Sequence, residues 1–310
     1  MANPPGGPVI VKTALICPGQ GAQVPGGVAL LPDGARAVFD RASRIIGVDL
    51  WEAGLHADQA TLAMPSLLQP FLVAWAVADL ARAEADYGEL PAPDYVLGHS
   101  SGENSALALS GATSFEAAVR YAAERGALLD DACHADDTGL LALAGVGRDA
   151  GEQIAAETGL DLANHNAFNQ VVLGGRRADI ERAVELVKAR GTRAVVLRVA
   201  GAFHSEHFAA ADRAAQPLID GLEIADTFTP LIGNASGQVI DDADGLRREL
   251  TMQFTRPIEW VAALQRAYDL GVRTVMVTGP GNAMNGLVRR FAQRVEEPVE
   301  VIRLNRHRSD

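Results

Sequence analysis

The feature that most restricts the fold of this chain is a Gly-His-Ser-Ser-Gly pentapeptide at residues 98–102, between an apolar segment and a helical one. Residues 95–97 predict a short buried strand, and residues 101–110 predict a helix that ends at Gly111. The turn between them leaves no space for flanking side chains, and it presents Ser100 over the N-terminus of the helix. The pentapeptide therefore predicts a nucleophilic serine; the competing interpretation is a glycine-rich turn with a serine cap.

Strands and helices alternate along most of the remaining sequence. Apolar runs at 8–17 and 272–278 predict buried strands, the first of which ends at Pro18. Residues 69–85 predict a helix with Pro70 in its first turn, and Ser114 is placed to cap a helix over 115–130. A further helix is expected over 283–293. This alternation favours an α/β fold with a mainly parallel sheet.

The middle of the chain has a different order of elements. Strands are expected at 140–146, 160–163, 170–173 and 193–199, with helices at 149–157 and 180–189. A β-α-β-β-α-β order is the plan of a ferredoxin-like domain. We therefore predict a small ferredoxin-like domain at residues 138–199, inserted into a large α/β domain formed by residues 1–137 and 200–310.

Composition excludes several classes of protein. The 310 residues are 48% hydrophobic and 21% charged, as in globular proteins. A net charge of −12 argues against nucleic-acid binding, which normally uses a basic surface. Cys17 and Cys133 are far apart and lack metal-ligand spacing, so no metal site and a reducing compartment are expected. No apolar run reaches the ~18 residues of a membrane span, and no secretion signal is evident, so we expect a cytoplasmic protein without membrane contact.

A serine nucleophile needs a base, and the chain offers seven histidines. His204 follows an apolar strand at the predicted return from the small domain to the large one, where α/β folds commonly place functional groups. His99 adjoins the serine, but its side chain must diverge in a tight turn. His204 is therefore the predicted base, although a histidine in such a place is more often a cap.

Arg125 is a third candidate. On the predicted helix it lies only about 60° from the centre of the apolar face, whereas Arg120 lies about 160° away. A guanidinium beside the core needs an anionic partner. That partner is either an internal carboxylate or the carboxylate of a substrate, which a planar guanidinium binds with two hydrogen bonds.

Together these motifs resemble those of malonyl-CoA:acyl-carrier-protein transacylases and the related acyltransferase domains of polyketide synthases. The matching segments are spread over nearly the whole chain: 18–23, Gln69-Pro70, 98–103, Arg125-Gly126, 201–204, Gln253 with Pro257, and 279–281. Several ordered motifs are far more specific than any single one. The resemblance implies an α/β-hydrolase-like large domain with an inserted ferredoxin-like small domain.

The resemblance also implies the catalytic groups. Ser100 and His204 would form a dyad, with His204 oriented by the backbone carbonyl of Gln253 rather than by an acidic residue. The backbone N–H groups of Gln20 and Ser101 would form the oxyanion hole.

The substrate-binding residues implied by the resemblance are Arg125, Phe203 and His99. Arg125 would bind the substrate carboxylate, and an aromatic residue before the histidine is associated with malonyl groups. Ser101 and Asn104 depart from the apolar residues usual at their positions, so the exact acyl group stays open.

We therefore expect transfer of a malonyl group from coenzyme A to an acyl carrier protein, in fatty-acid or polyketide synthesis, by a monomer without metal or redox cofactor. The alternatives are a trans-acting acyltransferase for another extender unit, an editing acyl hydrolase and a non-catalytic carrier-binding protein.

Residues 176–198 carry seven basic and three acidic side chains, a net of +4. Arg176, Arg177 and Arg182 would attract an acidic carrier, unless they belong to an ordinary helix with internal ion pairs.

Overall fold

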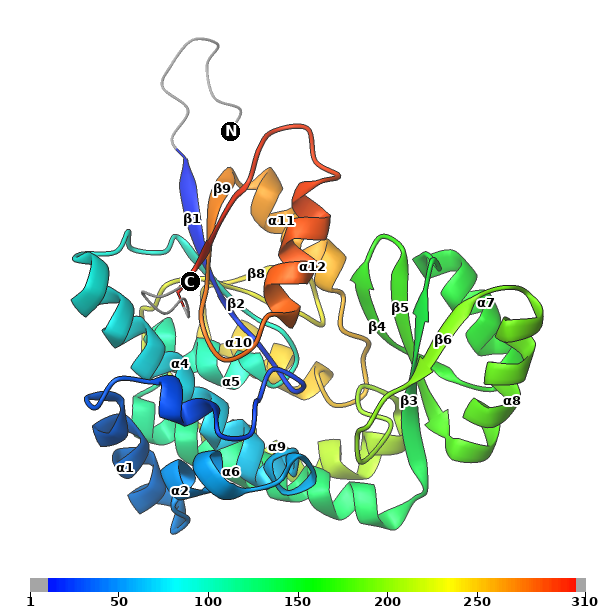
Figure 1. Cartoon of the computed structure of the whole chain (residues 1–310), viewed down its shortest axis with the longest axis horizontal. Helices are drawn as coiled ribbons and strands as arrows, with labels where there is room; N and C mark the ends of the chain where they lie inside the picture. Colours follow the sequence, from blue (N-terminus) through cyan, green and yellow to red (C-terminus); the bar gives the residue numbers. More distant parts are fainter. Residues whose placement is uncertain (1–10, 305–310) are drawn as a thin grey trace.

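The computed structural model describes residues 11–304. Its larger part is built on a six-stranded sheet with the order β10-β9-β1-β2-β7-β8 (Figure 1). All neighbouring strands are parallel except β7 and β8. The strands are β1 (Lys12–Cys17), β2 (Tyr95–Gly98), β7 (Leu231–Ile232), β8 (Val239–Ile240), β9 (Val272–Val277) and β10 (Glu300–Arg303).

Helices cover both faces of this sheet, because alternate residues of its central strands face opposite sides. Leu15 and Val96 pack with the helices α1 to α6, α9 and α10, whereas Ile16 and Leu97 pack with α11 and α12. The helices are η1 (Gly27–Leu30), α1 (Ala35–Ile46), α2 (Leu50–His56), α3 (Gln59–Leu62), α4 (Pro65–Tyr87), α5 (Gly102–Leu109), α6 (Phe115–Ala135), η2 (Glu206–Phe208), α9 (Ala209–Asp220), α10 (Ala243–Met252), α11 (Trp260–Asp269) and α12 (Ala283–Ala292).

A second, antiparallel sheet with the order β4-β5-β3-β6 forms a small unit beside the large one (Figure 1). Its helices α7 and α8 lie on the side turned away from the large unit. Leu141 and Leu173 pack against these helices, whereas Leu140 and Val172 join the core of the large unit. The elements are β3 (Thr138–Ala144), α7 (Arg148–Thr158), β4 (Asp161–Ala167), β5 (Gln170–Arg176), α8 (Arg177–Ala189) and β6 (Arg193–Val196).

Backbone hydrogen bonds join the small sheet to the large unit. The His165 N–H donates to the Ile258 carbonyl at 2.8 Å, and the Ile258 N–H donates to the Ala163 carbonyl at 2.9 Å. The segment before α11 thus extends the edge of β4 and joins the two units.

The predicted fold class is confirmed: an α/β fold with a small β-α-β-β-α-β unit. The domain boundaries at 137/138 and 199/200 stay a prediction. Residues 8–10 of the first predicted strand lie outside the described residues. The sequence patterns gave no sign of α1, α2, α3, α10, α11, β7, β8 or β10.

One predicted helix start was wrong. Helix α4 begins at Pro65 rather than near residue 69, so Pro70 lies inside the helix and not in its first turn. Pro65 occupies the helix start that suits a residue without an N–H group, and Pro70 gives up one internal hydrogen bond.

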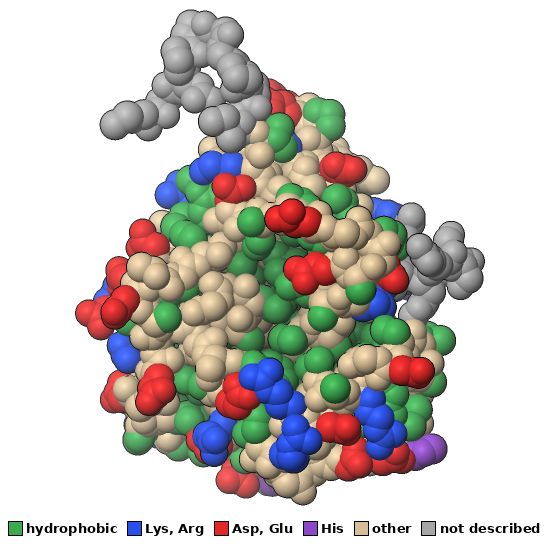
Figure 2. All heavy atoms as spheres, turned by 90° about the vertical axis from the view of Figure 1, so that its left-hand side faces the viewer, with side chains coloured by type: hydrophobic (Ala, Val, Ile, Leu, Met, Phe, Trp, Pro, Cys, Tyr) green, Lys and Arg blue, Asp and Glu red, His purple; other side chains and the backbone are tan. Residues whose placement is uncertain are grey.

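Charged side chains of both signs are interspersed on the face of the molecule shown in Figure 2, around an apolar hollow. The excess of negative charge therefore does not form a single patch on that face. Among residues 11–304, no helix is both long and apolar enough to cross a membrane.

Candidate active site

The pentapeptide forms the sharp turn between β2 and α5, with Ser100 in a left-handed backbone conformation (φ 52°). A Cβ atom on Gly98 would lie 2.2 Å from the Glu103 nitrogen, and one on Gly102 would lie 2.3 Å from the Cys17 carbonyl oxygen. Only glycine fits either position, which confirms the predicted steric reason for both glycines. The left-handed serine is a strained conformation of the kind that concentrates at functional sites.

Ser100 and His204 are in direct contact although 104 residues separate them. The Ser100 hydroxyl lies 2.7 Å from His204 Nε2, and His204 Nδ1 lies 2.8 Å from the Gln253 carbonyl oxygen. A carbonyl oxygen only accepts, so Nδ1 carries the proton and Nε2 is free to accept the serine proton. His204 also has a positive φ of 63°, so both members of the pair are held in strained backbone conformations.

His204 is buried, with 5% of its surface exposed. Burial lowers its pKa to about 3; the hydrogen bond to Gln253 opposes this shift, and the nearby charge of Arg125 adds to it. The imidazole is therefore neutral at pH 7 and ready to accept a proton.

The dyad lies in a narrow pocket with a volume of about 10 Å³, roughly the space of one water molecule. The lining residues are Gln20, Gln69, Ser100, Ser101, Arg125, Leu129, Phe203, His204, Gln253 and Phe254. Most of the residues singled out in the sequence therefore meet in one place.

The two predicted oxyanion donors lie side by side, with one difference between them. The Gln20 N–H donates to the Ser101 hydroxyl at 3.1 Å, whereas the Ser101 N–H has no hydrogen-bond partner within residues 11–304. The hydroxyl of the unusual serine at position 101 thus accepts a hydrogen bond from the Gln20 N–H, the predicted oxyanion donor, when no substrate is bound.

Arg125 projects from α6 into the far end of the pocket and is 2% exposed. A Cβ on Gly126 would lie 2.4 Å from the Pro65 carbonyl oxygen, so the glycine lets α6 approach the start of α4 closely. Arg125 donates from Nη1 to Gln69 Oε1 at 2.9 Å and from Nη2 to Gln253 Oε1 at 2.6 Å.

The partners of Arg125 are neutral amides. Its Cζ atom lies 4.8 Å from the centre of the Phe254 ring, and no carboxylate within residues 11–304 forms an ion pair with it. Burial lowers the pKa of Arg125, which reflects the cost of keeping its charge away from water. Within the described residues no carboxylate bonds directly to Arg125, but the charge of the buried Glu103, on the other side of the Gln253 amide, opposes the lowering of the Arg125 pKa.

The remaining substrate-binding candidates have different surroundings. Phe203 lines the pocket and packs on Phe208, with ring centres 5.0 Å apart. His99 does not line it: its Nε2 lies 2.7 Å from Asn166 Oδ1, and its ring contacts Trp260. Its contact with substrate stays a prediction. Asn104 is fully buried and donates to Gln69 Oε1 at 2.9 Å, so it reaches the pocket only through Gln69.

The predicted carrier-binding arginines do not form a uniform patch. Arg177 pairs with Asp137 at 2.6 Å, and Arg182 pairs with Asp179 on α8. Arg176 is exposed and makes no ion pair within the described residues. It lies opposite Thr138 in the sheet, and the Thr138 hydroxyl accepts from the Ala202 N–H at 3.0 Å, two residues before His204.

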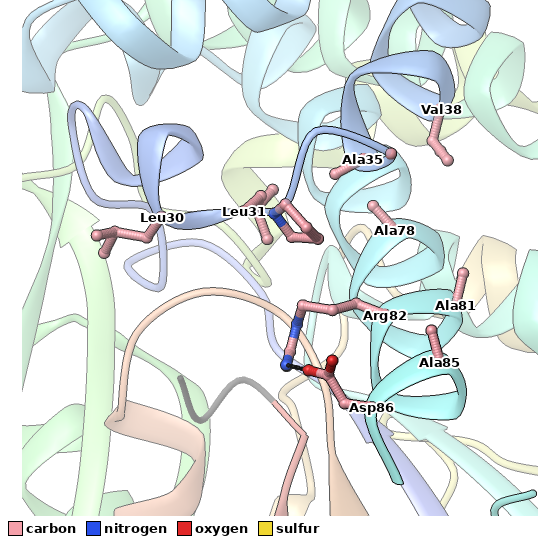
Figure 3. Close-up of a pocket in the computed structure, with 11 residues that line it drawn as sticks. Leu30, Leu31, Ala35, Val38, Ala78, Ala81, Arg82, Ala85 and Asp86 are labelled. Carbon is pink, nitrogen blue, oxygen red and sulfur yellow. Dashed lines mark hydrogen bonds and ion pairs between the residues drawn. The ribbon is translucent and has the colours of Figure 1, made fainter. Parts of the chain in front are cut away.

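A more open apolar groove of about 470 Å³ lies between the segment 30–38 and α4 (Figure 3). Leu30, Leu31, Val38 and several alanines line it, and Arg82 and Asp86 form an ion pair at 3.0 Å along its wall. None of the predicted site residues contributes to it.

The fold and the serine–histidine pair are those of an α/β protein with a nucleophilic serine. Similarity to known proteins shows to which family the chain belongs. The family model of the acyl transferase domain matches residues 14–229. The malonyl CoA-acyl carrier protein transacylase of Bacillus subtilis is 31% identical over 92% of each chain. The polyketide biosynthesis protein ThaF of Burkholderia thailandensis is 36% identical over 94% of this chain, which corresponds to 25% of ThaF.

Solved structures agree. A malonyl-transacylase whose structure is known in complex with its type II polyketide synthase acyl-carrier protein is 26% identical, with a TM-score of 0.88 over 96% of this chain and 97% of that one. The chain belongs to the acyl transferase family, together with the malonyl-CoA:acyl-carrier-protein transacylases, and is an acyltransferase.

Five pocket or supporting residues had no function predicted from the sequence: Gln69, Glu103, Leu129, Asn234 and Phe254. Gln69 and Glu103 belong to segments that carry the resemblance, which was a usable signal. Asn234, whose Oδ1 accepts from the Ser100 N–H at 3.3 Å, stands in a loop that no sequence pattern marked.

Proposed function

We propose that this acyltransferase moves a malonyl group from coenzyme A to the phosphopantetheine thiol of an acyl carrier protein, through a malonyl ester on Ser100. The observation that carries the proposal is Arg125, a buried guanidinium that bonds directly to no carboxylate among residues 11–304 and lies in the same pocket as the serine–histidine pair. A substrate that brings its own carboxylate supplies the missing countercharge.

In the first half-reaction, His204 Nε2 accepts the Ser100 proton while the serine oxygen attacks the thioester carbon of malonyl-CoA. The N–H groups of Gln20 and Ser101 stabilise the oxyanion, and the substrate displaces the Ser101 hydroxyl from the Gln20 N–H. The carbon–sulfur bond then breaks, His204 returns the proton to the sulfur, and free coenzyme A leaves.

In the second half-reaction, the carrier thiol gives its proton to His204 and attacks the ester carbon. The ester carbon–oxygen bond breaks, the proton returns to Ser100, and the malonyl group leaves as a thioester of the carrier. The Gln253 carbonyl, 2.8 Å from Nδ1, stabilises the imidazolium that forms in both halves. No redox change is involved.

Arg125 also separates the proposal from its alternatives. An editing hydrolase that accepts uncharged acyl groups would leave this guanidinium bonded to neutral amides alone, whereas a malonyl group supplies a carboxylate that bonds to it directly. Phe203 lines the pocket beside His204, and its large ring favours malonyl over branched carboxylated groups. Similarity to ThaF supports polyketide synthesis as one setting, and similarity to the Bacillus enzyme supports fatty-acid synthesis as another.

The direct test is intact-mass analysis after mixing the protein with malonyl-CoA, methylmalonyl-CoA or acetyl-CoA, followed by addition of a holo acyl carrier protein. We expect a malonyl adduct on Ser100 that disappears as malonyl-carrier forms. A preference for acetyl-CoA or methylmalonyl-CoA, or faster release of free acid than transfer, would contradict the proposal.

We further propose that an acidic carrier is attracted by Arg176 more than by Arg182, because Asp179 already neutralises Arg182. Arg176→Glu should raise the apparent KM for the carrier about threefold to tenfold at low salt, and the difference should shrink at high salt. Arg182→Glu is the matched control, with a smaller expected change. Equal carrier kinetics for wild type and Arg176→Glu at low salt would exclude this docking site.

A further inference from the structure

A buried carboxylate lies behind the pocket, and the proposed mechanism does not use it. Glu103, in the first turn of α5, is 1% exposed and receives three hydrogen bonds. Oε1 accepts from the side-chain N–H of Asn234 at 2.6 Å and from its backbone N–H at 3.3 Å, and Oε2 accepts from Nε2 of Gln253. All three partners are donors, so both oxygens of Glu103 must act as acceptors.

These bonds decide how two amide groups face the pocket. Because Nε2 of Gln253 points at Glu103, Oε1 of Gln253 points at Arg125, 2.6 Å from Nη2. Because Nδ2 of Asn234 points at Glu103, Oδ1 of Asn234 faces the N–H of Ser100 at 3.3 Å. An amide has one donor and one acceptor side, so the carboxylate orients both groups.

We propose that Glu103 is a positioning residue for substrate selection: it orients the Gln253 amide, and through it holds the Arg125 guanidinium where a substrate carboxylate binds. The inference rests on the proposed malonyl transfer and deepens it. The dyad depends on Glu103 less directly, because His204 is held by the Gln253 backbone carbonyl, which does not rotate with the side chain.

The isosteric variant Glu103→Gln has a defined consequence. Two donors of Asn234 face Oε1, and one of them is a backbone N–H that cannot turn, so the new amide keeps its oxygen there. Its NH2 group then faces Gln253, whose amide must flip and present its own NH2 to Arg125. Two donors facing each other repel, which displaces the guanidinium.

Glu249 provides the matched control. It is also 1% exposed, but its side chain accepts hydrogen bonds from the backbone N–H groups of Ala235 and Ser236. Only its backbone carbonyl, which the substitution leaves in place, accepts from the Gln253 N–H at 3.1 Å. A general loss of stability from neutralising a buried carboxylate should affect both variants. Only Glu103→Gln should change the choice of substrate.

The experiment measures kcat/KM for acylation of Ser100 by malonyl-CoA and by acetyl-CoA in wild type, Glu103→Gln and Glu249→Gln, with Tm of each. We expect the malonyl-to-acetyl ratio to fall about tenfold in Glu103→Gln, mainly through KM for malonyl-CoA, and to stay at the wild-type value in Glu249→Gln. If Glu103→Gln does not fold, Glu103→Asp keeps the charge but withdraws it from Gln253, and its ratio should fall at least about threefold.

The outcomes separate the two ideas. A wild type without preference for malonyl would overturn the proposed function and this inference with it. A wild-type preference that persists in the folded Glu103 variants, or that Glu249→Gln lowers equally, would overturn the positioning role of Glu103 alone.

Discussion

At the dyad end of the pocket the backbone holds the reacting groups, whereas at the arginine end side chains do so. Ser100 and His204 have left-handed backbone conformations, and the partner of His204 is a main-chain carbonyl. Arg125 is held by the amides of Gln69 and Gln253, and these in turn by Asn104 and Glu103. Most side-chain substitutions should therefore leave the geometry of the serine–histidine pair unchanged. Substrate selection, in contrast, depends on a series of side-chain hydrogen bonds to Arg125, and a single substitution can remove one of them.

The largest expected effect is at the dyad end. Ser100→Ala should abolish the acyl-enzyme and lower transfer by roughly 10³-fold or more, because it removes the hydroxyl that His204 is placed to activate. His204→Ala should also slow acylation strongly while leaving the fold intact. Intact mass and circular dichroism test both variants, and a malonyl adduct on another residue of Ser100→Ala would contradict the assignment.

A smaller, selective effect is expected at the arginine end. Arg125→Ala removes two charge-assisted hydrogen bonds to the substrate carboxylate and should lower kcat/KM for malonyl-CoA about 100-fold. Acetyl-CoA has no carboxylate, so its kcat/KM should change far less. Arg120→Ala, an exposed position on the same helix, is the control. An equal loss for both thioesters would show that the two ends are not separable.

The smallest effect concerns pH. Because burial lowers the pKa of His204 to about 3, the base stays neutral as the pH falls from 7.5 to 5. The acylation rate in rapid-quench experiments should therefore change less than about twofold over this range, whereas an unshifted histidine would lose over 90% of its neutral form. An acid limb near pH 6.5 would contradict the burial of His204.

The same shift affects stability. The unfolded chain binds a proton at His204 near pH 6.5, but the folded protein does so only near pH 3. Its contribution to stability is therefore complete above about pH 6.5 and is lost as the pH falls towards 3.

The α/β class and most elements could be predicted because they depend on local patterns. Residues 95–111 carried the strand, the glycine turn and the helix within one short segment, and Ser114 marked the start of α6, where its hydroxyl accepts from the Ala117 N–H at 3.1 Å. The strands β7 and β8, two residues each, have no periodicity to detect. The start of α4 was missed because Pro70 was interpreted as a first-turn residue, although Pro65 held that position.

By itself, the sequence determined where glycine was obligatory, which segments alternate as strands and helices, and which residue types were available for acyl transfer. The tertiary structure alone decided which groups meet: that Arg125 faces amides rather than a carboxylate, that Arg177 pairs with Asp137, and that Glu103 reaches Gln253 across 150 positions. The physical reason is the sequence separation over which each kind of interaction acts. Helix, strand and turn preferences act over a few residues, whereas the partner of a buried charge is set by the packing of segments that are distant in the chain.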